Sequence, residues 1–204
     1  KSVSRGLGDV YKRQMLDGNP GYFWAPASNW ALGDVASDDF YKGSSIDDQP
    51  QLNDVERYTP GTTNIYLSRK WKAMYEGISR ANQTLSSIAI AIENGESEEA
   101  LSVLGGEAKF LRAYYHFEIK KIWNNIPYMT EALTTTPPND VDVWPLIEED
   151  LLAAIAVLPE MQDDAGRATS WIAKAYLAKA HMFQNDFAAA KPVLDDIISG
   201  GPFQ

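Results

Sequence analysis

The segment from Gly106 to Tyr128, GEAKFLRAYYHFEIKKIWNNIPY, constrains the fold of this chain more than any other part of the sequence. Aromatic and aliphatic side chains recur in it at spacings of three and four residues, which predicts a helix with a broad apolar face. We expect this helix to cover residues 106–123, because Gly105 should interrupt any helix before it and Pro127 follows its end. A single helix cannot shield so many rings from water, so the segment requires other helices to pack against it.

The composition narrows the classes of protein to consider. With 204 residues, of which 45% are hydrophobic, the chain is long enough for one globular domain or for part of a larger one. The formal net charge of -10 would repel the negatively charged phosphate backbone of a nucleic acid, so nucleic acid is not an expected partner. The absence of cysteine excludes disulfide bonds, thiolate metal sites and cysteine nucleophiles. No apolar run has the length of a membrane-spanning helix.

The two ends of the sequence differ from the ends of an ordinary domain. Residues 1–14, KSVSRGLGDVYKRQ, are basic although the rest of the chain is acidic, and they resemble translated sequencing-adaptor read-through. We expect them to be a non-native leader ahead of a partial helical domain at 15–204; the alternative is a genuine basic N-terminal arm. No signal peptide is visible, and the sequence GGPFQ stops just after a helical pattern. We therefore expect an internal fragment of a longer protein.

Hydrophobic periodicity predicts further helices and, with them, an all-α fold. Their expected ranges are 66–93, 143–158, 170–184 and 187–199. Residues 15–64 and 129–142 are rich in Gly, Pro, Asp, Asn, Ser and Thr, which is typical of long irregular loops, and a short helix is expected near 31–36. Short connections between successive helices favour antiparallel hairpins.

The last two expected helices form a tetratricopeptide-like unit at 170–202. Leu177 and Ala178 occupy the leucine and small positions of its first helix, and Ala190 occupies the small position of its second helix. Lys174 stands where the repeat usually has tryptophan. The two preceding helices would form a second, looser unit. The predicted fold is therefore a set of tetratricopeptide-like helical hairpins with long irregular loops.

No catalytic or metal-binding signature is visible in the sequence. The two histidines, His116 and His181, lie on different expected helices, and we interpret them as structural or surface residues. The acidic run 148–150 points in several directions around one helix, so we interpret it as a solvated face and not as a catalytic pair. The acidic loop residues at 34–39 lack the spacing of a calcium-binding loop. The sequence thus predicts neither an enzyme nor a bound cofactor or metal.

The aromatic-rich loop between residues 22 and 66 is the candidate binding site. Sugars present flat apolar C–H faces ringed by hydroxyl groups, and proteins bind them with exposed aromatic rings and polar side chains. The loop carries both kinds of side chain. The glycan-binding candidates are Trp24, Trp30, Tyr41, Asn53, Arg57, Tyr58, Asn64 and Tyr66. The alternative is that these rings only dock the loop onto the helices.

Five stretches of the sequence carry a family resemblance. They are ASDDFYKG (36–43), WKAMYEGISRANQTLSSI (71–88), the segment 106–128, LIEEDLLAAIAVLP (146–159) and GRATSWIAKAYLAKAHMFQNDFAAAKPVLDDIISGGPF (166–203). In this order they resemble the N-terminal portion of the SusD/RagB family, the surface glycan-binding lipoproteins of Bacteroidota. Each motif alone is modest, but together they cover most of the chain after residue 36.

The resemblance implies a function that composition and periodicity do not. Members of this family are not enzymes; they build on a tetratricopeptide scaffold, are anchored to the outer membrane by a lipidated N-terminal cysteine, and capture glycans at the cell surface. They cover a SusC-like TonB-dependent transporter and pass the glycan inward. We therefore expect this chain to bind a glycan or oligosaccharide and to deliver it to such a transporter, with the lipid anchor in a part missing from the fragment. Asn82 and Arg112 match family motif positions, and we interpret both as structural, with Asn82 bonded to a neighbouring backbone group.

Two other functions remain open from the residues alone. A tetratricopeptide interaction scaffold binds a peptide or protein in a groove lined by the first helix of each unit. Long aromatic loops interrupt such a groove here, and the repeat's regular spacing is not found upstream. An enzyme acting on glycans needs two carboxylates facing each other across a cleft, and no feature of the sequence indicates such a pair.

Overall fold

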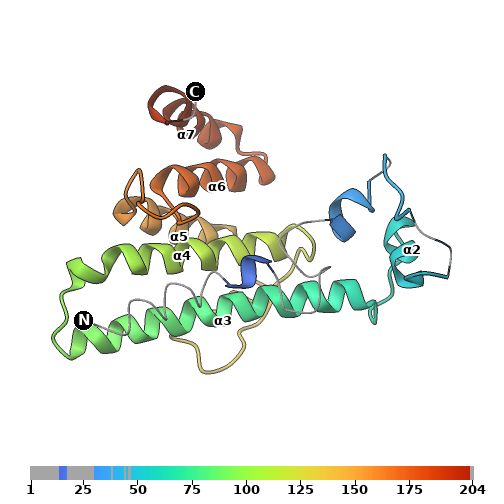
Figure 1. Ribbon diagram of the computed structural model, residues 1–204, viewed down its shortest axis with the longest axis horizontal. Coiled ribbons are helices and arrows are strands. Elements are labelled where there is room, and N and C mark those ends of the chain that lie inside the picture. Colours follow the sequence, from blue (N-terminus) through green and yellow to red (C-terminus); the bar gives the residue numbers. More distant parts are fainter. Residues whose placement is uncertain (1–13, 18–29, 38, 44, 46, 203–204) are drawn as a thin grey trace. The chain divides into compact units, whose positions relative to one another are not determined.

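The computed structural model of the protein describes residues 14–17, 30–37, 39–43, 45 and 47–202. These residues form helices and irregular segments with no strand among them, so the predicted all-α class is confirmed (Figure 1). The helices are, in chain order, η1 (Gln14–Asp17), η2 (Trp30–Asp34), α2 (Pro50–Glu56), α3 (Ile65–Glu93), α4 (Glu98–Lys120), α5 (Trp144–Val157), α6 (Ser170–Phe183) and α7 (Phe187–Gly200). Among these described helices, none is both long and apolar enough to cross a membrane.

The described chain divides into two compact units, and the division falls inside α3, between Gly77 and Ile78. The larger unit contains residues 78–202, and the smaller unit contains the described residues up to Gly77. All of the expected leader except Gln14 lies outside the described residues.

The long helix α3 confirms the expected helix at 66–93. Its end is set by Gly95, which has a φ of 95° that a residue with a side chain rarely adopts. The amide of Gly95 donates to the carbonyl of Ile92 at 2.9 Å, and the amide of Glu96 donates to the carbonyl of Ala91 at 3.0 Å. These two bonds satisfy carbonyls in the last turn that would otherwise lack a partner inside the helix.

The helix α4 starts earlier than the sequence pattern predicts. It begins at Glu98, with Ser97 capping its first turn, and it passes through Gly105 and Gly106 without a break. The expected start at Gly106 is therefore wrong. The reason lies in packing, because a β-carbon at Gly106 would lie 2.5 Å from Val157 Cγ2 in α5. The glycine permits the two helices to approach closely and does not end a helix.

The helices α4 to α7 form a stack in which each helix packs on the next. Figure 1 shows them following one another, with α7 at the far end from α4. The small residues Ala178 and Ala190 are buried, as expected for a close pair of helices. Thr169 and Asp186 cap the first turns of α6 and α7 with their side chains. The expected helical hairpins are thus confirmed.

The aromatic face of α4 is buried within this stack. Nearly every residue from 106 to 119 is buried. Three rings of α4, those of Phe110, Tyr114 and Phe117, meet the ring of Tyr176 in α6 edge to face, with centroids 5.7, 5.3 and 5.7 Å apart. Burial raises the pKa of Tyr176 to about 12, because loss of water disfavours the phenolate. Neighbouring helices therefore cover the rings of the aromatic segment, as expected.

A buried polar network ties α4 to α3, to α5 and to the segment that follows α4. Arg112 donates to both carboxylate oxygens of Asp150, from Nε at 2.6 Å and from Nη2 at 2.8 Å. It also donates to the side chain of Asn82 at 3.0 Å and to Glu131. Asn82 in turn donates to the carbonyl of Met129 at 3.1 Å. The expected structural roles of Asn82 and Arg112 agree with these bonds.

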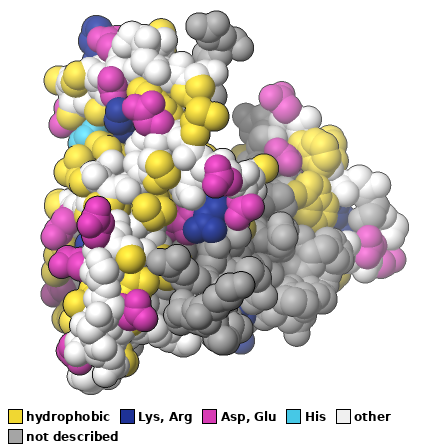
Figure 2. Space-filling view, turned by 60° about the vertical axis from the view of Figure 1, so that its left-hand side comes forward, with side chains coloured by type: hydrophobic (Ala, Val, Ile, Leu, Met, Phe, Trp, Pro, Cys, Tyr) yellow, Lys and Arg dark blue, Asp and Glu magenta, His cyan; other side chains and the backbone are white. Residues whose placement is uncertain are grey.

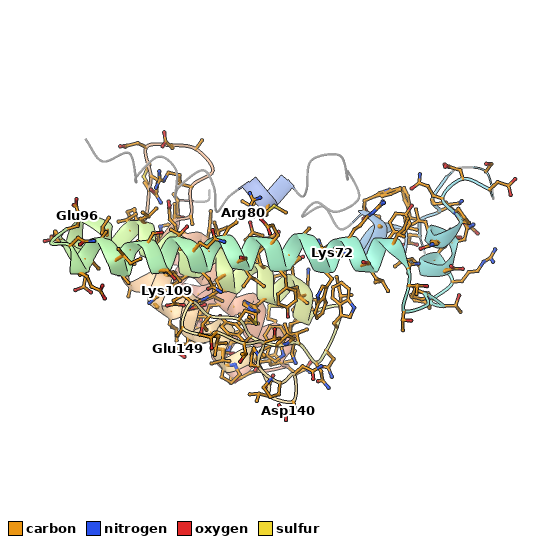
Figure 3. The ribbon with its side chains drawn as sticks, turned by 90° about the horizontal axis from the view of Figure 1, so that it is seen from below. Lys72, Arg80, Glu96, Lys109, Asp140 and Glu149 are labelled. Carbon is orange, nitrogen blue, oxygen red and sulfur yellow. The ribbon has the colours of Figure 1, made fainter. Side chains whose placement is uncertain are left out.

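Asp150 corrects the interpretation of the run 148–150 as a solvated face. Its carboxylate is buried and also accepts a hydrogen bond from the hydroxyl of Tyr128 at 2.5 Å, whereas Glu149, labelled in Figure 3, is exposed. Burial by itself lowers the pKa of Arg112, but the hydrogen bond and the charge of Asp150 outweigh it and raise that pKa. The run alone could not show this, because consecutive carboxylates on a helix point in different directions.

His116 is a buried histidine with both ring nitrogens bonded, as interpreted from the sequence. Its Nε2 accepts from the amide of Met129 at 3.0 Å, so Nδ1 carries the proton and donates to the carbonyl of Arg112 at 2.9 Å. The ring stacks on Tyr128 with centroids 3.9 Å apart. Burial lowers the pKa of His116 to about 3, so the ring is uncharged at neutral pH.

A second buried ion pair anchors the turn between α5 and α6. Glu107 in α4 is almost fully buried and accepts from Arg167 Nε at 2.8 Å and Nη2 at 3.0 Å. The side-chain amide of Gln162 donates to the same carboxylate at 2.9 Å. Long-range bonds therefore hold this irregular turn in place.

Candidate functional site

The smaller unit carries the candidate binding residues on a small apolar support. Its core is built by η2, α2 and the start of α3, with the buried side chains of Ala31, Val35, Leu52, Val55 and Tyr66. Trp30 is partly buried and packs against this core. For this ring the structure therefore agrees with the alternative stated above, in which the aromatic side chains of the loop only dock it onto the rest of the fold. The short helix η2 agrees with the helix expected near 31–36, whereas α2 was not expected. Trp24 lies outside the described residues.

Asn64 and Tyr66 are buried, each with 2% of its surface exposed. Asn64 donates to the carbonyl of Gln51 at 2.8 Å and accepts from the amide of Tyr66 at 3.0 Å, which joins α2 to the first turn of α3. The hydroxyl of Tyr66 donates to Gln49 Oε1 at 2.5 Å. Burial, with the charge of Asp48, raises the pKa of Tyr66. These two side chains hold the support together, which corrects the expectation that they form part of an exposed surface.

Tyr58 is exposed, and its backbone has an uncommon conformation. It follows α2 with a φ of 57°, in the left-handed region that glycine usually occupies at this position. The amide of Tyr58 donates to the carbonyl of Val55 at 3.1 Å, and the amide of Thr59 donates to that of Asp54 at 2.8 Å, which is the bond pattern of a Schellman turn. The hydroxyl of Tyr58 donates to the carbonyl of Ala36, yet 68% of the residue is exposed. A large ring held in a strained turn and open to solvent points to a functional surface.

Tyr41 and Phe40 are further exposed rings of the smaller unit, with 77% and 45% of their surfaces exposed. They lie in the irregular segment between η2 and α2. Sequence reasoning selected Tyr41 and missed Phe40. The signal that indicates Phe40 is its place beside Tyr41 in a segment without helical periodicity, where burial of both rings is not expected.

Lys42 shapes the segment that carries Tyr41. Its Nζ donates to the carbonyl of Ser45 at 2.9 Å and to the carbonyl of Asp48. The chain can turn back toward these carbonyls because Gly43 has a φ of 80°. The position of Tyr41 therefore depends on a turn closed by its neighbour in the sequence.

Of the polar candidates, Asn53 lies in the middle of α2, and Arg57 follows the end of that helix, next to Tyr58. Arg57 is exposed, and Asn53 is partly buried. Asn53, Arg57 and Tyr58 thus belong to α2 and to the turn that follows it, and we refer to them, together with Phe40 and Tyr41, as the tyrosine surface.

The tyrosine surface offers side chains that are suited to binding a ligand. Figure 2 shows hydrophobic side chains at the surface of the smaller unit, to the right in that view, with acidic side chains beside them. Within the described parts of the chain, no group of three or more His, Asp or Glu side chains is arranged to hold a metal ion. Aromatic rings with adjacent amide and guanidinium groups can stack on a ligand and hydrogen-bond to it.

Comparison with known proteins identifies the family. Residues 24–182 match the SusD-like family described as starch-binding associating with outer membrane. Because the match covers most of the chain, this protein belongs to the SusD-like family, and the resemblance seen in the sequence motifs is confirmed.

Curated relatives agree with this assignment. A SusD-like protein of Bacteroides ovatus is 32% identical over 122 residues, which are 57% of this chain and 22% of that protein. SusD-like protein P2 of Formosa agariphila is 27% identical over 146 residues, which are 67% of this chain and 28% of that protein. The chain therefore spans less than a third of the length of these relatives.

Solved structures show the same fold. A laminarin binding SusD-like protein matches with a TM-score of 0.82 at 27% identity, covering 100% of this chain and 44% of that chain. Surface glycan-binding protein A from Bacteroides thetaiotaomicron, in complex with laminarihexaose, matches with a TM-score of 0.83 at 21% identity, covering 98% of this chain and 43% of that chain. The second likeness concerns the fold alone. The predicted tetratricopeptide-like helical scaffold is thus the scaffold of this family.

Proposed function

We propose that this chain is part of a surface protein that binds glycans or oligosaccharides for nutrient uptake, and that the tyrosine surface contacts the sugar. The observation that carries the proposal is the exposure of Tyr41 and Tyr58 in a member of the SusD-like family. A structural relative at 27% identity is itself a laminarin binding protein.

The tyrosine surface has the groups that a sugar requires. The faces of Tyr41 and Tyr58 can stack on the apolar C–H faces of a pyranose ring. Arg57 offers N–H donors to ring and hydroxyl oxygens, and an asparagine such as Asn53 both donates and accepts. The hydrogen bond from Tyr58 to Ala36 fixes the ring before a ligand arrives, so less conformational entropy is lost on binding.

We further infer the place of the whole protein in the cell. Its family is described as associating with the outer membrane, which supports a place at that membrane. Exposure at the cell surface and attachment by a lipid anchor are part of our proposal. Delivery of the captured glycan to a SusC-like TonB-dependent transporter is the corresponding proposal for the partner. The proposed activity is binding without catalysis, and release of new reducing ends from a bound polysaccharide would contradict it.

Affinity gel electrophoresis tests the binding proposal. Polysaccharides are cast into native gels one at a time, and the mobility of the chain is compared with that in an empty gel. We expect retardation by at least one polysaccharide, with affinity reduced about 10-fold by Tyr41→Ala or Tyr58→Ala. The matched control is Phe187→Ala, which removes an exposed ring of the larger unit. Mobility unchanged by every polysaccharide, or an equal loss in the control, would refute the proposal.

Co-purification tests the partner. The full-length protein is tagged in its native host, extracted with mild detergent and captured. We expect a TonB-dependent transporter in stoichiometric amount. Capture of the tagged protein alone from membranes that contain the transporter would contradict this part of the proposal.

A tetratricopeptide-type scaffold for protein–protein interaction is the second candidate. The observation that favours it is the exposure of Met182, Phe183 and Phe187 around the turn between α6 and α7. A scaffold function predicts that Phe187→Ser abolishes capture of a protein partner and leaves retardation by polysaccharides unchanged.

A further inference from the structure

Acidic side chains outnumber basic ones in the stretch of sequence that carries the exposed tyrosines. Residues 39–58 contain five carboxylates and two cationic side chains, which leaves a formal charge of -3. Three of the carboxylates, those of Asp39, Asp47 and Asp48, belong to exposed residues. The charge of the whole chain, -10, has the same sign. A ligand that reaches the tyrosine surface therefore approaches through a negative potential.

The lysine of this segment does little to offset that potential. Lys42 directs its ammonium group at the carbonyls of Ser45 and Asp48, so two of its three donors serve the backbone of its own segment. One donor of Lys42 remains for a ligand, and its positive charge is already included in the formal charge of -3. Arg57 is the other cation between residues 39 and 58, and the same stretch of sequence contains five carboxylates.

These charges have different consequences for neutral and for anionic sugars. In water, one pair of like charges about 4 Å apart lowers an affinity by about 5-fold, and a polyanion brings a new charge with each modified sugar. A neutral pyranose meets no such repulsion, since its hydroxyl groups are dipoles that can turn toward carboxylates as donors. Stacking on a tyrosine face is available to both kinds of sugar, so charge decides between them.

We infer that the tyrosine surface takes uncharged glycans and excludes glycans that carry carboxylate or sulfate groups. The inference rests on the proposed glycan-binding function and adds the chemical class of the ligand. It follows from the excess of carboxylates over cations and from the engagement of Lys42 with the backbone.

A matched pair of polysaccharides tests it. A neutral polysaccharide that retards the chain is compared with the same polymer after part of its C6 hydroxymethyl groups have been oxidised to carboxylates. At low salt we expect the affinity for the oxidised polymer to be lower by about 5-fold or more. High salt should restore part of that loss, because added ions screen charges at the surface. A loss caused by a changed sugar shape would not respond to salt.

A pair of triple variants locates the effect. Asp39→Asn, Asp47→Asn and Asp48→Asn together should raise the ratio of oxidised to neutral affinity by about 5-fold at low salt. The control combines Glu93→Gln, Glu96→Gln and Glu160→Gln, which remove the same number of charges from exposed residues of the larger unit. Figure 3 shows Glu96 at the turn between α3 and α4. The control should leave the ratio unchanged.

The possible outcomes separate this inference from the proposed function. If the oxidised polymer binds as tightly as the neutral polymer at low salt, or if both triple variants change the ratio equally, the selectivity is refuted and glycan binding stands. If no polysaccharide of either kind retards the chain, the proposed function fails and the selectivity fails with it.

Discussion

At the scale of single residues, burial of His116 makes stability depend on pH in a known direction. The pKa of His116 is about 3 in the folded chain and 6.5 in the reference state, so the unfolded chain binds a proton at a higher pH than the folded chain does. The stabilisation is complete above the reference value and is lost as the pH falls toward the folded value. From about pH 7 to about pH 5, the free energy of unfolding should fall by about 2 kcal/mol from this residue. Urea unfolding at both pH values measures it.

The histidine variants provide the control for this prediction. His116→Gln should shrink the difference in unfolding free energy between the two pH values, whereas His181→Gln, at a partly exposed position, should preserve most of it. An unchanged difference in His116→Gln would show that other groups cause the pH dependence.

Tyr58 allows function and stability to be separated at one residue. Glycine in its left-handed turn relieves about 1–2 kcal/mol of backbone strain, and loss of the hydroxyl bond to Ala36 costs about 1 kcal/mol. Tyr58→Gly should therefore leave the free energy of unfolding unchanged or slightly higher, while glycan affinity falls about 10-fold. Thermal melts and affinity gels measure the two effects, and Tyr58→Phe tests the hydroxyl alone. Unfolding of Tyr58→Gly would make Tyr58 a structural residue.

At the scale of elements, two adjacent glycines of α4 should respond in opposite ways to the same change. A β-carbon at Gly106 would lie 2.5 Å from Val157 Cγ2, whereas one at Gly105 has its nearest neighbour, Ile88 Cδ1, at 3.8 Å. Gly106→Ala should therefore destabilise the chain by about 1–3 kcal/mol through overpacking. Gly105→Ala should stabilise it by about 0.5–1 kcal/mol, since alanine is the better helix former. The denaturant midpoints of both variants test this prediction. An unchanged midpoint in Gly106→Ala would contradict the close approach described for α4 and α5, and a lower midpoint in Gly105→Ala would contradict the space found at Gly105.

Helices with clear apolar periodicity could be predicted from the sequence, but the contacts that each helix makes with other helices could not. The bounds of α3, α5, α6 and α7 agree with expectation to within one or two residues, because a repeating apolar face fixes a helix locally. The predicted start of α4 was wrong because Gly106 is needed for close packing against Val157, and Val157 is far away in the sequence. The burial of Asp150 was missed for the same reason, since its partner Arg112 lies on another helix.

The candidate site was predictable as a region and less so residue by residue. The exposed positions of Tyr41 and Tyr58 agree with the expectation of rings displayed on an irregular loop. Tyr66 has the same residue type as these two, yet it is buried, and so is Asn64, because the unexpected helix α2 packs over the start of α3. Residue type alone does not distinguish a ring that docks a loop from a ring that binds a ligand.

At the scale of the whole molecule, the apolar face of α7 should govern solution behaviour. Phe187 and Ile198 are exposed, and their spacing of eleven residues places them on one side of the helix with Leu194. Exposed apolar faces of this kind promote association. We expect the chain to self-associate as its concentration rises, and Phe187→Ser with Ile198→Ser to shift it toward the monomer.

Size-exclusion chromatography with light scattering measures this shift. The matched control is Ile90→Ser, at an exposed position of α3, which should leave the association unchanged. A monomer at every concentration would refute the prediction.

The buried network around Arg112 also makes one stretch of the chain available for engineering. Met129 is held by Asn82 and His116, and Val143 is buried at the start of α5, so both flanks of the connection between them are fixed. Residues 132–136 are exposed between these fixed points. Foreign sequence is tolerated best where the flanking backbone is anchored and the inserted part does not displace packed groups. An epitope or a fluorescent reporter placed within 134–136 should therefore leave the packing of the helices intact.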